Sequence, residues 1–114
     1  MKGPKLNNLK WWGVDFDGVV CRSKYNPVTD KWDMLGVMPD TRKVLTKIQK
    51  SGKKVVIITS RASQEYIEIE EFMNENKLPF DRIVTGKELV EFMIDDRAIH
   101  FESWEQVEKE LWKD

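Results

Sequence analysis

Apolar residues occur in short runs separated by stretches of helical spacing, and this pattern predicts the elements of the fold. Residues 55–58 form an unbroken β-branched run, which is typical of a strand buried on both faces of a parallel sheet. Residues 11–16 are apolar and end in acidic residues, which indicates a first strand. Shorter apolar runs predict three further strands at residues 80–84, 92–94 and 98–101.

Three helices are predicted where apolar residues recur every three to four positions. Asp40 suits the N-cap of the first helix, Ser63 suits that of the second, and Ser103 with Gln106 forms a capping-box pattern before the third. Strands that alternate with helices indicate an α/β fold, a parallel sheet with right-handed crossovers. The predicted apolar helix faces consist of Val44, Leu45 and Ile48; Tyr66, Ile69, Phe72 and Met73; and Trp104, Val107 and Leu111.

The segment after the first strand has a different character. Residues 18–38 contain the turn formers Asn26-Pro27 and Thr29-Asp30 together with Gly36, and they predict an irregular loop or a short hairpin. The chain has 114 residues, no internal repeat and no low-complexity segment, so we expect a single domain over residues 1–114.

The overall charge is close to balanced and excludes some classes of partner. The 19 Lys and Arg residues face 20 Asp and Glu residues, so no basic excess favours nucleic acid. Cys21 is the one cysteine and cannot form an intramolecular disulfide. Residues 1–10 are polar and do not resemble a signal peptide, and no stretch is long enough to span a membrane. The expected compartment is therefore the cytoplasm, without a membrane partner.

Polar residues follow several predicted strands at their carboxyl ends. In open α/β sheets this edge is where ligands bind, so we expect these side chains to converge there. The converging side chains are four acids, a hydroxyl and an ammonium group: Asp15 and Asp17, Asp95 and Asp96, Thr59, and Lys87.

These side-chain types suit the chemistry of a phosphate ester. Carboxylates are ligands for Mg²⁺, and one carboxylate can instead attack phosphorus to form an aspartyl phosphate. If the chain turns after Asp15, Asp17 can lie beside the leaving group as a general acid, and Gly18 permits the bend. A hydroxyl and an ammonium group can neutralise the phosphoryl oxygens.

The same residues carry a resemblance to a known family. Residues 14–19 resemble the first motif of the haloacid dehalogenase-like superfamily, in which apolar residues precede Asp-x-Asp-Gly. Residues 55–59 are similar to its second motif, an apolar strand that ends in Thr or Ser. Lys87 fits the third-motif lysine, and residues 94–96 fit the acid pair of the fourth motif. The resemblance covers nearly all of residues 11–112.

This resemblance implies roles for individual residues and a sheet order of 5-4-1-2-3. Asp15 would be the nucleophile and a Mg²⁺ ligand. Asp17 would be the general acid/base, and its backbone carbonyl would bind the metal. The other implied roles are phosphoryl binding by Thr59 and Lys87 and Mg²⁺ binding by Asp95, with Asp96 assisting directly or through water.

The resemblance also indicates a subtype. Superfamily dehalogenases lack the second acid of the first motif, so Asp17 indicates a phosphatase or phosphomutase. The chain has no room for a cap domain and is similar to short capless phosphatases, with a flap at about residues 19–38. In this flap, Trp32 either stacks on a substrate ring or pins the flap in place. Arg61 either contacts substrate or forms a salt bridge with a neighbouring acid.

The expected function is Mg²⁺-dependent hydrolysis of phosphate monoesters, with a phosphorylated small molecule as the substrate. A polynucleotide 3′-phosphatase is an alternative, because an open site admits large substrates, although the neutral charge does not favour nucleic acid. A non-catalytic binding scaffold is another. A receiver-type signalling module uses similar residues, but its nucleophile lies on the third strand. The sequence leaves the substrate and a homo-oligomeric state open.

Overall fold

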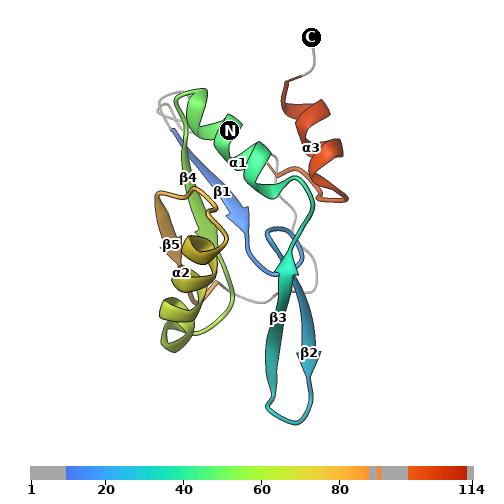
Figure 1. Cartoon of the computed structure of the whole chain (residues 1–114), viewed down its shortest axis with the longest axis vertical. Coiled ribbons are helices and arrows are strands. Elements are labelled where there is room, and N and C mark those ends of the chain that lie inside the picture. Colours follow the sequence, from blue (N-terminus) through green and yellow to red (C-terminus); the bar gives the residue numbers. More distant parts are fainter. Residues whose placement is uncertain (1–9, 88–89, 91–97, 113–114) are drawn as a thin grey trace.

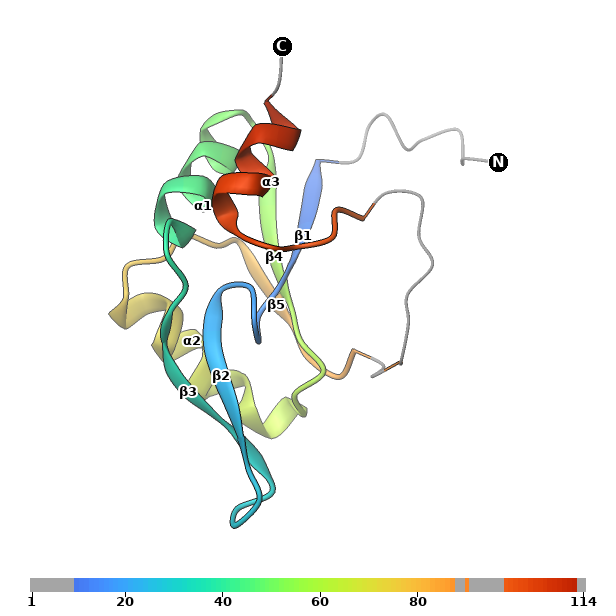
Figure 2. The ribbon, with the colours of Figure 1, turned by 90° about the vertical axis from the view of Figure 1, so that its right-hand side faces the viewer.

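A parallel sheet of three strands forms the centre of the protein. The computed structural model describes residues 10–87, 90 and 98–112. Strand β1 (Trp11–Asp15) pairs with β4 (Lys54–Ile58), and β4 pairs with β5 (Arg82–Val84), both in parallel. The strands follow one another across the sheet in chain order, and right-handed crossovers therefore bring the two connecting helices to the same face. Figure 2 shows both helices on one side of the sheet.

The described residues form four helical segments besides this sheet. Helix α1 (Thr41–Lys50) connects β1 to β4 by way of the hairpin, and the 3₁₀ turn η2 (Ser63–Glu65) leads into α2 (Tyr66–Glu75). Helix α3 (Trp104–Leu111) lies beside α1 (Figures 1 and 2). The expected helix faces supply most of the helical contribution to the core, with Val44, Leu45, Ile48, Ile69, Met73, Trp104 and Val107 all buried.

The strands of the sheet also contribute buried residues to the core. Val14, Val55, Ile57 and Ile83 are buried under the helices, as the apolar runs predicted. Val56 and Ile58 are only partly buried, so β4 is not covered completely on both faces as the β-branched run predicted. Within the described residues, no helix has both the length and the apolar character that crossing a bilayer requires.

The segment after β1 is a hairpin, one of the two structures that its turn residues allowed. Strand β2 (Cys21–Asn26) pairs with β3 (Lys31–Val37) in antiparallel fashion, with an irregularity between Arg22 and Ser23. The hairpin projects from the body of the protein on the side where β1 ends (Figure 1). It occupies the region expected for the flap, and no larger insertion is present in the described part of the chain.

Two of the three predicted helix caps differ from expectation. Asp40 is the N-cap of α1, but its φ of 67° is left-handed and its side chain makes no capping hydrogen bond. Ser63 caps nothing, because it lies inside η2, and Glu65 precedes the first residue of α2. The capping box of α3 is confirmed: the Gln106 N–H donates to the Ser103 hydroxyl at 3.1 Å.

The fifth predicted strand is wrong. Residues 98–101 are described and form no strand. The Gln106 side chain bonds this segment to α3 instead, donating to the His100 carbonyl at 3.1 Å and accepting from the Glu102 N–H at 3.0 Å. The fourth predicted strand, residues 92–94, lies outside the described residues. Over the residues that it describes, the structure therefore shows an α/β fold with a three-stranded parallel sheet, and it does not show the order 5-4-1-2-3.

The tryptophans divide between core and surface. Trp104 is buried, and Trp12 and Trp112 are half-buried with their rings 6.3 Å apart. Trp11, in the predicted first strand, is 44% exposed, because its side chain faces outward at the start of β1 beneath the Lys54 ammonium group. Trp32 in the hairpin is 50% exposed.

Candidate active site

The register of the sheet places three strand ends at one edge. Asp15 is paired with Ile58, and Ile58 with Val84, so β1, β4 and β5 end side by side. The loops that follow β4 and β5 are then joined to each other. The Gly86 N–H donates to the Arg61 carbonyl at 2.9 Å, and the loop that carries Lys87 is therefore held close to the end of β4.

The chain turns sharply after Asp15, which is the condition under which Asp17 could lie beside a leaving group. The Phe16 carbonyl accepts hydrogen bonds from the N–H groups of Val20 and Cys21, each at 3.0 Å. Gly18 has a φ of 82°, which residues with a side chain rarely adopt. This turn lifts Asp17 out of the strand direction and directs its side chain toward the hairpin and the loop after β4.

Asp15 and Lys87 meet at this edge of the sheet. The Lys87 ammonium group donates to both carboxylate oxygens of Asp15, at 3.0 and 3.1 Å. The Lys87 N–H donates to the Thr59 carbonyl at 2.9 Å, and this bond fixes the backbone from which the ammonium group reaches Asp15. Both side chains remain partly open to solvent, with 47% of Asp15 and 33% of Lys87 exposed. A ligand can therefore reach this pair.

Thr59 is the first residue after β4 and is buried. Its hydroxyl oxygen accepts the Arg61 N–H at 3.1 Å, and its own N–H donates to the Val84 carbonyl at 3.0 Å. The hydroxyl proton makes no hydrogen bond to any other described residue. Thr59 therefore shapes the loop after β4 and keeps a donor at the strand end.

Asp17 has quite different surroundings from Asp15, although the two lie only two residues apart. Its carboxylate accepts three hydrogen bonds from Arg61, two from Nε at 3.2 and 3.0 Å and one from Nη2 at 2.8 Å. The Ser23 hydroxyl donates to the same carboxylate at 2.7 Å. Asp17 is therefore tied both to the hairpin and to the loop after β4.

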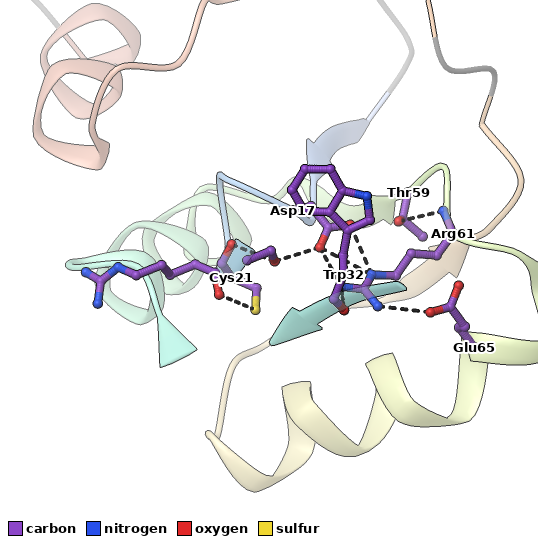
Figure 3. Close-up of polar contacts among 8 residues, drawn as sticks. Asp17, Cys21, Trp32, Thr59, Arg61 and Glu65 are labelled. Carbon is purple, nitrogen blue, oxygen red and sulfur yellow. Dashed lines mark hydrogen bonds and ion pairs between the residues drawn. The ribbon is translucent and has the colours of Figure 1, made fainter. Parts of the chain in front are cut away.

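Arg61 forms the salt bridge that was one of its two expected roles. Its guanidinium group also donates to Glu65 at 3.0 Å and to the Trp32 carbonyl at 2.8 Å (Figure 3). Burial opposes the positive charge, but the hydrogen bonds and charges of Asp17 and Glu65 outweigh it and raise the pKa of Arg61 above its ordinary value. Arg61 is thus a charged group bound on three sides by protein.

Ser23 and Glu65 are site residues that the sequence did not single out. Glu65 lies four residues after Arg61, a spacing that favours a pair only if both lie in a helical turn. Ser23 reaches Asp17 because the irregularity in the hairpin pairing lies beside it, and no local sequence signal marks that irregularity.

A pocket of about 330 Å³ opens between the hairpin and the start of α2. Trp32 forms part of its wall, and the Trp32 ring lies 5.6 Å from that of Tyr25 in an edge-on arrangement on the hairpin surface. Trp32 is therefore not packed away in the core. The pocket is lined by Thr29, Lys31, Trp32, Asp33, Met34, Arg61, Glu65 and Glu68.

Part of the predicted metal site lies within the described structure. Asp95 and Asp96 lie outside the described residues, and within the described ranges no group of three or more His, Cys, Asp or Glu side chains converges. The Asp15 carboxylate and the Asp17 backbone carbonyl are oxygen donors of the kind that Mg²⁺ prefers. The Asp17 carbonyl accepts no hydrogen bond from any described residue. These two donors fit part of a Mg²⁺ site, and the Asp17 carboxylate, held by Arg61, does not belong to it.

Comparison with known proteins identifies the fold and nothing further. No family model and no curated protein matches the chain. Among solved structures, the chain is similar to an MCSG target from Vibrio cholerae, with a TM-score of 0.64 and 22% identity. The match covers 89% of this chain and 95% of that chain. The two proteins share an α/β fold over nearly their whole length.

Proposed function

We propose that the protein is a Mg²⁺-dependent phosphohydrolase that cleaves phosphate monoesters through an aspartyl phosphate on Asp15. The observation that carries this proposal is the contact of the Lys87 ammonium group with both oxygens of Asp15 at the carboxyl edge of the sheet. Two other features support it. Asp17 lies in the turn that follows Asp15, and the resemblance to the haloacid dehalogenase-like superfamily assigns a role to each of these residues.

In the proposed reaction an Asp15 oxygen attacks phosphorus while the bond from phosphorus to the ester oxygen breaks. The leaving oxygen takes a proton from Asp17. Water then attacks the phosphorus of the aspartyl phosphate and gives its proton to Asp17, which releases inorganic phosphate and restores both carboxyl groups. Lys87 neutralises phosphoryl oxygens throughout, since its ammonium group already lies within 3.1 Å of the nucleophilic carboxylate.

A Mg²⁺ ion, when bound, would neutralise charge on the phosphoryl oxygens and orient them. The residues proposed to hold it are Asp15 through its carboxylate, Asp17 through its carbonyl, and Asp95 with Asp96.

The pocket beside the hairpin supports a small phosphorylated substrate. Arg61 lines this pocket and also binds Asp17, so a leaving group seated there would lie next to the proposed general acid. The pocket is lined by three acidic residues, Asp33, Glu65 and Glu68, and by two basic ones, Lys31 and Arg61. Because Arg61 is already paired with Asp17 and Glu65, the lining offers little positive charge to the phosphate backbone of a polynucleotide, which disfavours the 3′-phosphatase alternative.

The proposal is tested with a panel of phosphorylated sugars, nucleotides, peptides and oligonucleotides in the presence of Mg²⁺. Hydrolysis of at least one small phosphate ester, lost on addition of excess chelator, is the expected result. Full hydrolysis in excess chelator would contradict the metal requirement. Absence of hydrolysis across the panel, together with tight binding of one member, would favour the non-catalytic scaffold. Binding of an oligonucleotide that weakens as the salt concentration rises would favour the polynucleotide alternative.

A further inference from the structure

The Arg61 guanidinium group connects three separate parts of the protein. It binds the Asp17 carboxylate in the turn after β1, the Trp32 carbonyl on β3 and the Glu65 carboxylate in η2, each at 3.0 Å or less (Figure 3). The Arg61 side chain is 5% exposed, and the guanidinium carbon lies 5.7 Å from the centre of the Phe16 ring. Such a group has little surface left with which to contact a substrate.

We propose that Arg61 is a positioning residue that sets the orientation of the Asp17 carboxylate and couples it to the position of the hairpin. This inference rests on the proposed phosphatase function, in which Asp17 donates the proton to the leaving group. Paired N–H donors on a carboxylate fix its plane as well as its distance. Because the same Nη2 atom binds Asp17 and the Trp32 carbonyl, a shift of β3 and a rotation of the carboxylate are linked.

A guanidinium group is required for this arrangement. Its planar fork presents donors in fixed directions, whereas a lysine ammonium group is a compact charge that cannot bridge the same three acceptors. The Arg61→Lys variant therefore keeps the positive charge beside Asp17 and removes the orientation. The Ser23 hydroxyl remains on the carboxylate in this variant and holds it on one side only.

The test compares two aryl phosphates that differ in their need for a general acid. Phenyl phosphate has a poor leaving group and depends on protonation, whereas 2,4-dinitrophenyl phosphate has a good one and does not. The comparison uses kcat/KM, which reports the step that expels the leaving group and not the later hydrolysis of the aspartyl phosphate, where Asp17 acts on both esters alike. General acid catalysis contributes about 10²–10⁴-fold, so Asp17→Asn should lose about that factor in kcat/KM on phenyl phosphate and far less on the dinitrophenyl ester. We expect Arg61→Lys to reproduce this selective loss, at about tenfold or more on phenyl phosphate.

Arg42→Lys is the matched control. Arg42 is an exposed arginine on α1 that donates to the Asn76 carbonyl at 3.2 Å, and the substitution should leave both rates unchanged. If Arg61→Lys does not fold, Glu65→Gln serves in its place. It removes the charge on one partner of the guanidinium group and should give a smaller loss that is again confined to phenyl phosphate.

The outcomes separate this inference from the proposed function. Equal losses on both esters in folded Arg61→Lys, or in Glu65→Gln if that variant is used, would overturn the positioning role while leaving the phosphatase proposal intact. A rise in KM on both esters without a change in kcat would also overturn it, because it would make Arg61 a binding residue. An inactive wild-type protein, or an active Asp15→Asn variant, would contradict the proposed function itself.

Discussion

At the scale of single residues, the two acids of the first motif differ because the chain turns between them. Asp15 still lies in β1 and faces Lys87 at the open edge, whereas Asp17 lies beyond the turn and faces Arg61. A side chain that must attack phosphorus needs to be accessible, and one that must deliver a proton needs to be oriented. The surroundings of the two carboxylates match this division of roles.

Lys87→Ala tests the residue on which the proposed chemistry depends most after Asp15. Loss of one preorganised donor to developing negative charge typically costs about 10²–10³-fold in kcat, and we expect a loss of that size on an aryl phosphate. The pair with Asp15 is partly exposed, so the free energy of unfolding should change by less than about 1 kcal/mol. Steady-state kinetics and thermal melting measure the two effects. Wild-type kcat in the variant would remove Lys87 from the site.

The sequence predicted the convergence of Asp15, Thr59 and Lys87, because carboxyl ends of neighbouring parallel strands must meet at one edge. It left the partner of Arg61 open for an equally physical reason. Arg61 lies beyond the end of β4, where the alternation of side chains along a strand no longer fixes its direction. Its partners depend on the conformations of the turn after β1, the hairpin and the loop after β4. The contacts of Ser23 and the Trp32 carbonyl depend in turn on hairpin register, which local composition does not encode.

At the scale of elements, the sequence pattern predicted α1, α2, α3 and the strands β1, β4 and β5, but it did not predict how α1 and α2 begin. A cap depends on the backbone angles of one residue, and Asp40 adopts left-handed angles at which its side chain makes no capping hydrogen bond. The segment at residues 98–101 shows the same limit. Its apolar pattern is that of a strand, yet the Gln106 side chain donates to the His100 carbonyl, a group that a strand would use in pairing.

The capping difference gives a matched pair of substitutions. Ser103→Ala removes the hydroxyl that accepts the Gln106 N–H and should lower the free energy of unfolding by about 1 kcal/mol. Ser63→Ala is the control, because Ser63 is equally exposed and caps no helix, and it should change stability by less than about 0.5 kcal/mol. Urea denaturation of both variants measures this contrast. Equal effects of the two substitutions would refute it.

In the proposed function the hairpin acts as a flap. We expect Trp32→Ala to raise KM or lower kcat, because the half-exposed indole lines the same pocket as Arg61, which binds Asp17. Its melting temperature should stay close to that of the wild type, whereas loss of a fully buried tryptophan would cost about 3–5 kcal/mol. Kinetics and melting on the same preparation distinguish the two roles. Early melting with full activity of the folded fraction would end the flap hypothesis.

At the scale of the whole molecule, a three-stranded parallel sheet with helices and one projecting hairpin suffices to assemble the described part of the site (Figure 1). Three loops contribute to it, after β1, β4 and β5, and the hairpin adds the pocket wall. With no cap domain in the described chain, the proposed function assigns substrate selection to the hairpin and the start of α2, the two elements that line the pocket. In that proposal, closure of the site depends on the Arg61 contacts that join these two elements to Asp17.

Covalent trapping tests the central claim most directly. The wild-type protein, mixed with Mg²⁺ and an active phosphate ester and quenched in acid within the first turnover, should carry one phosphoryl group. Peptide mass spectrometry should place that group on Asp15, and the Asp15→Asn variant should show neither the adduct nor turnover. A phosphoryl group on Asp95 or any other residue, or steady turnover by Asp15→Asn, would contradict the account.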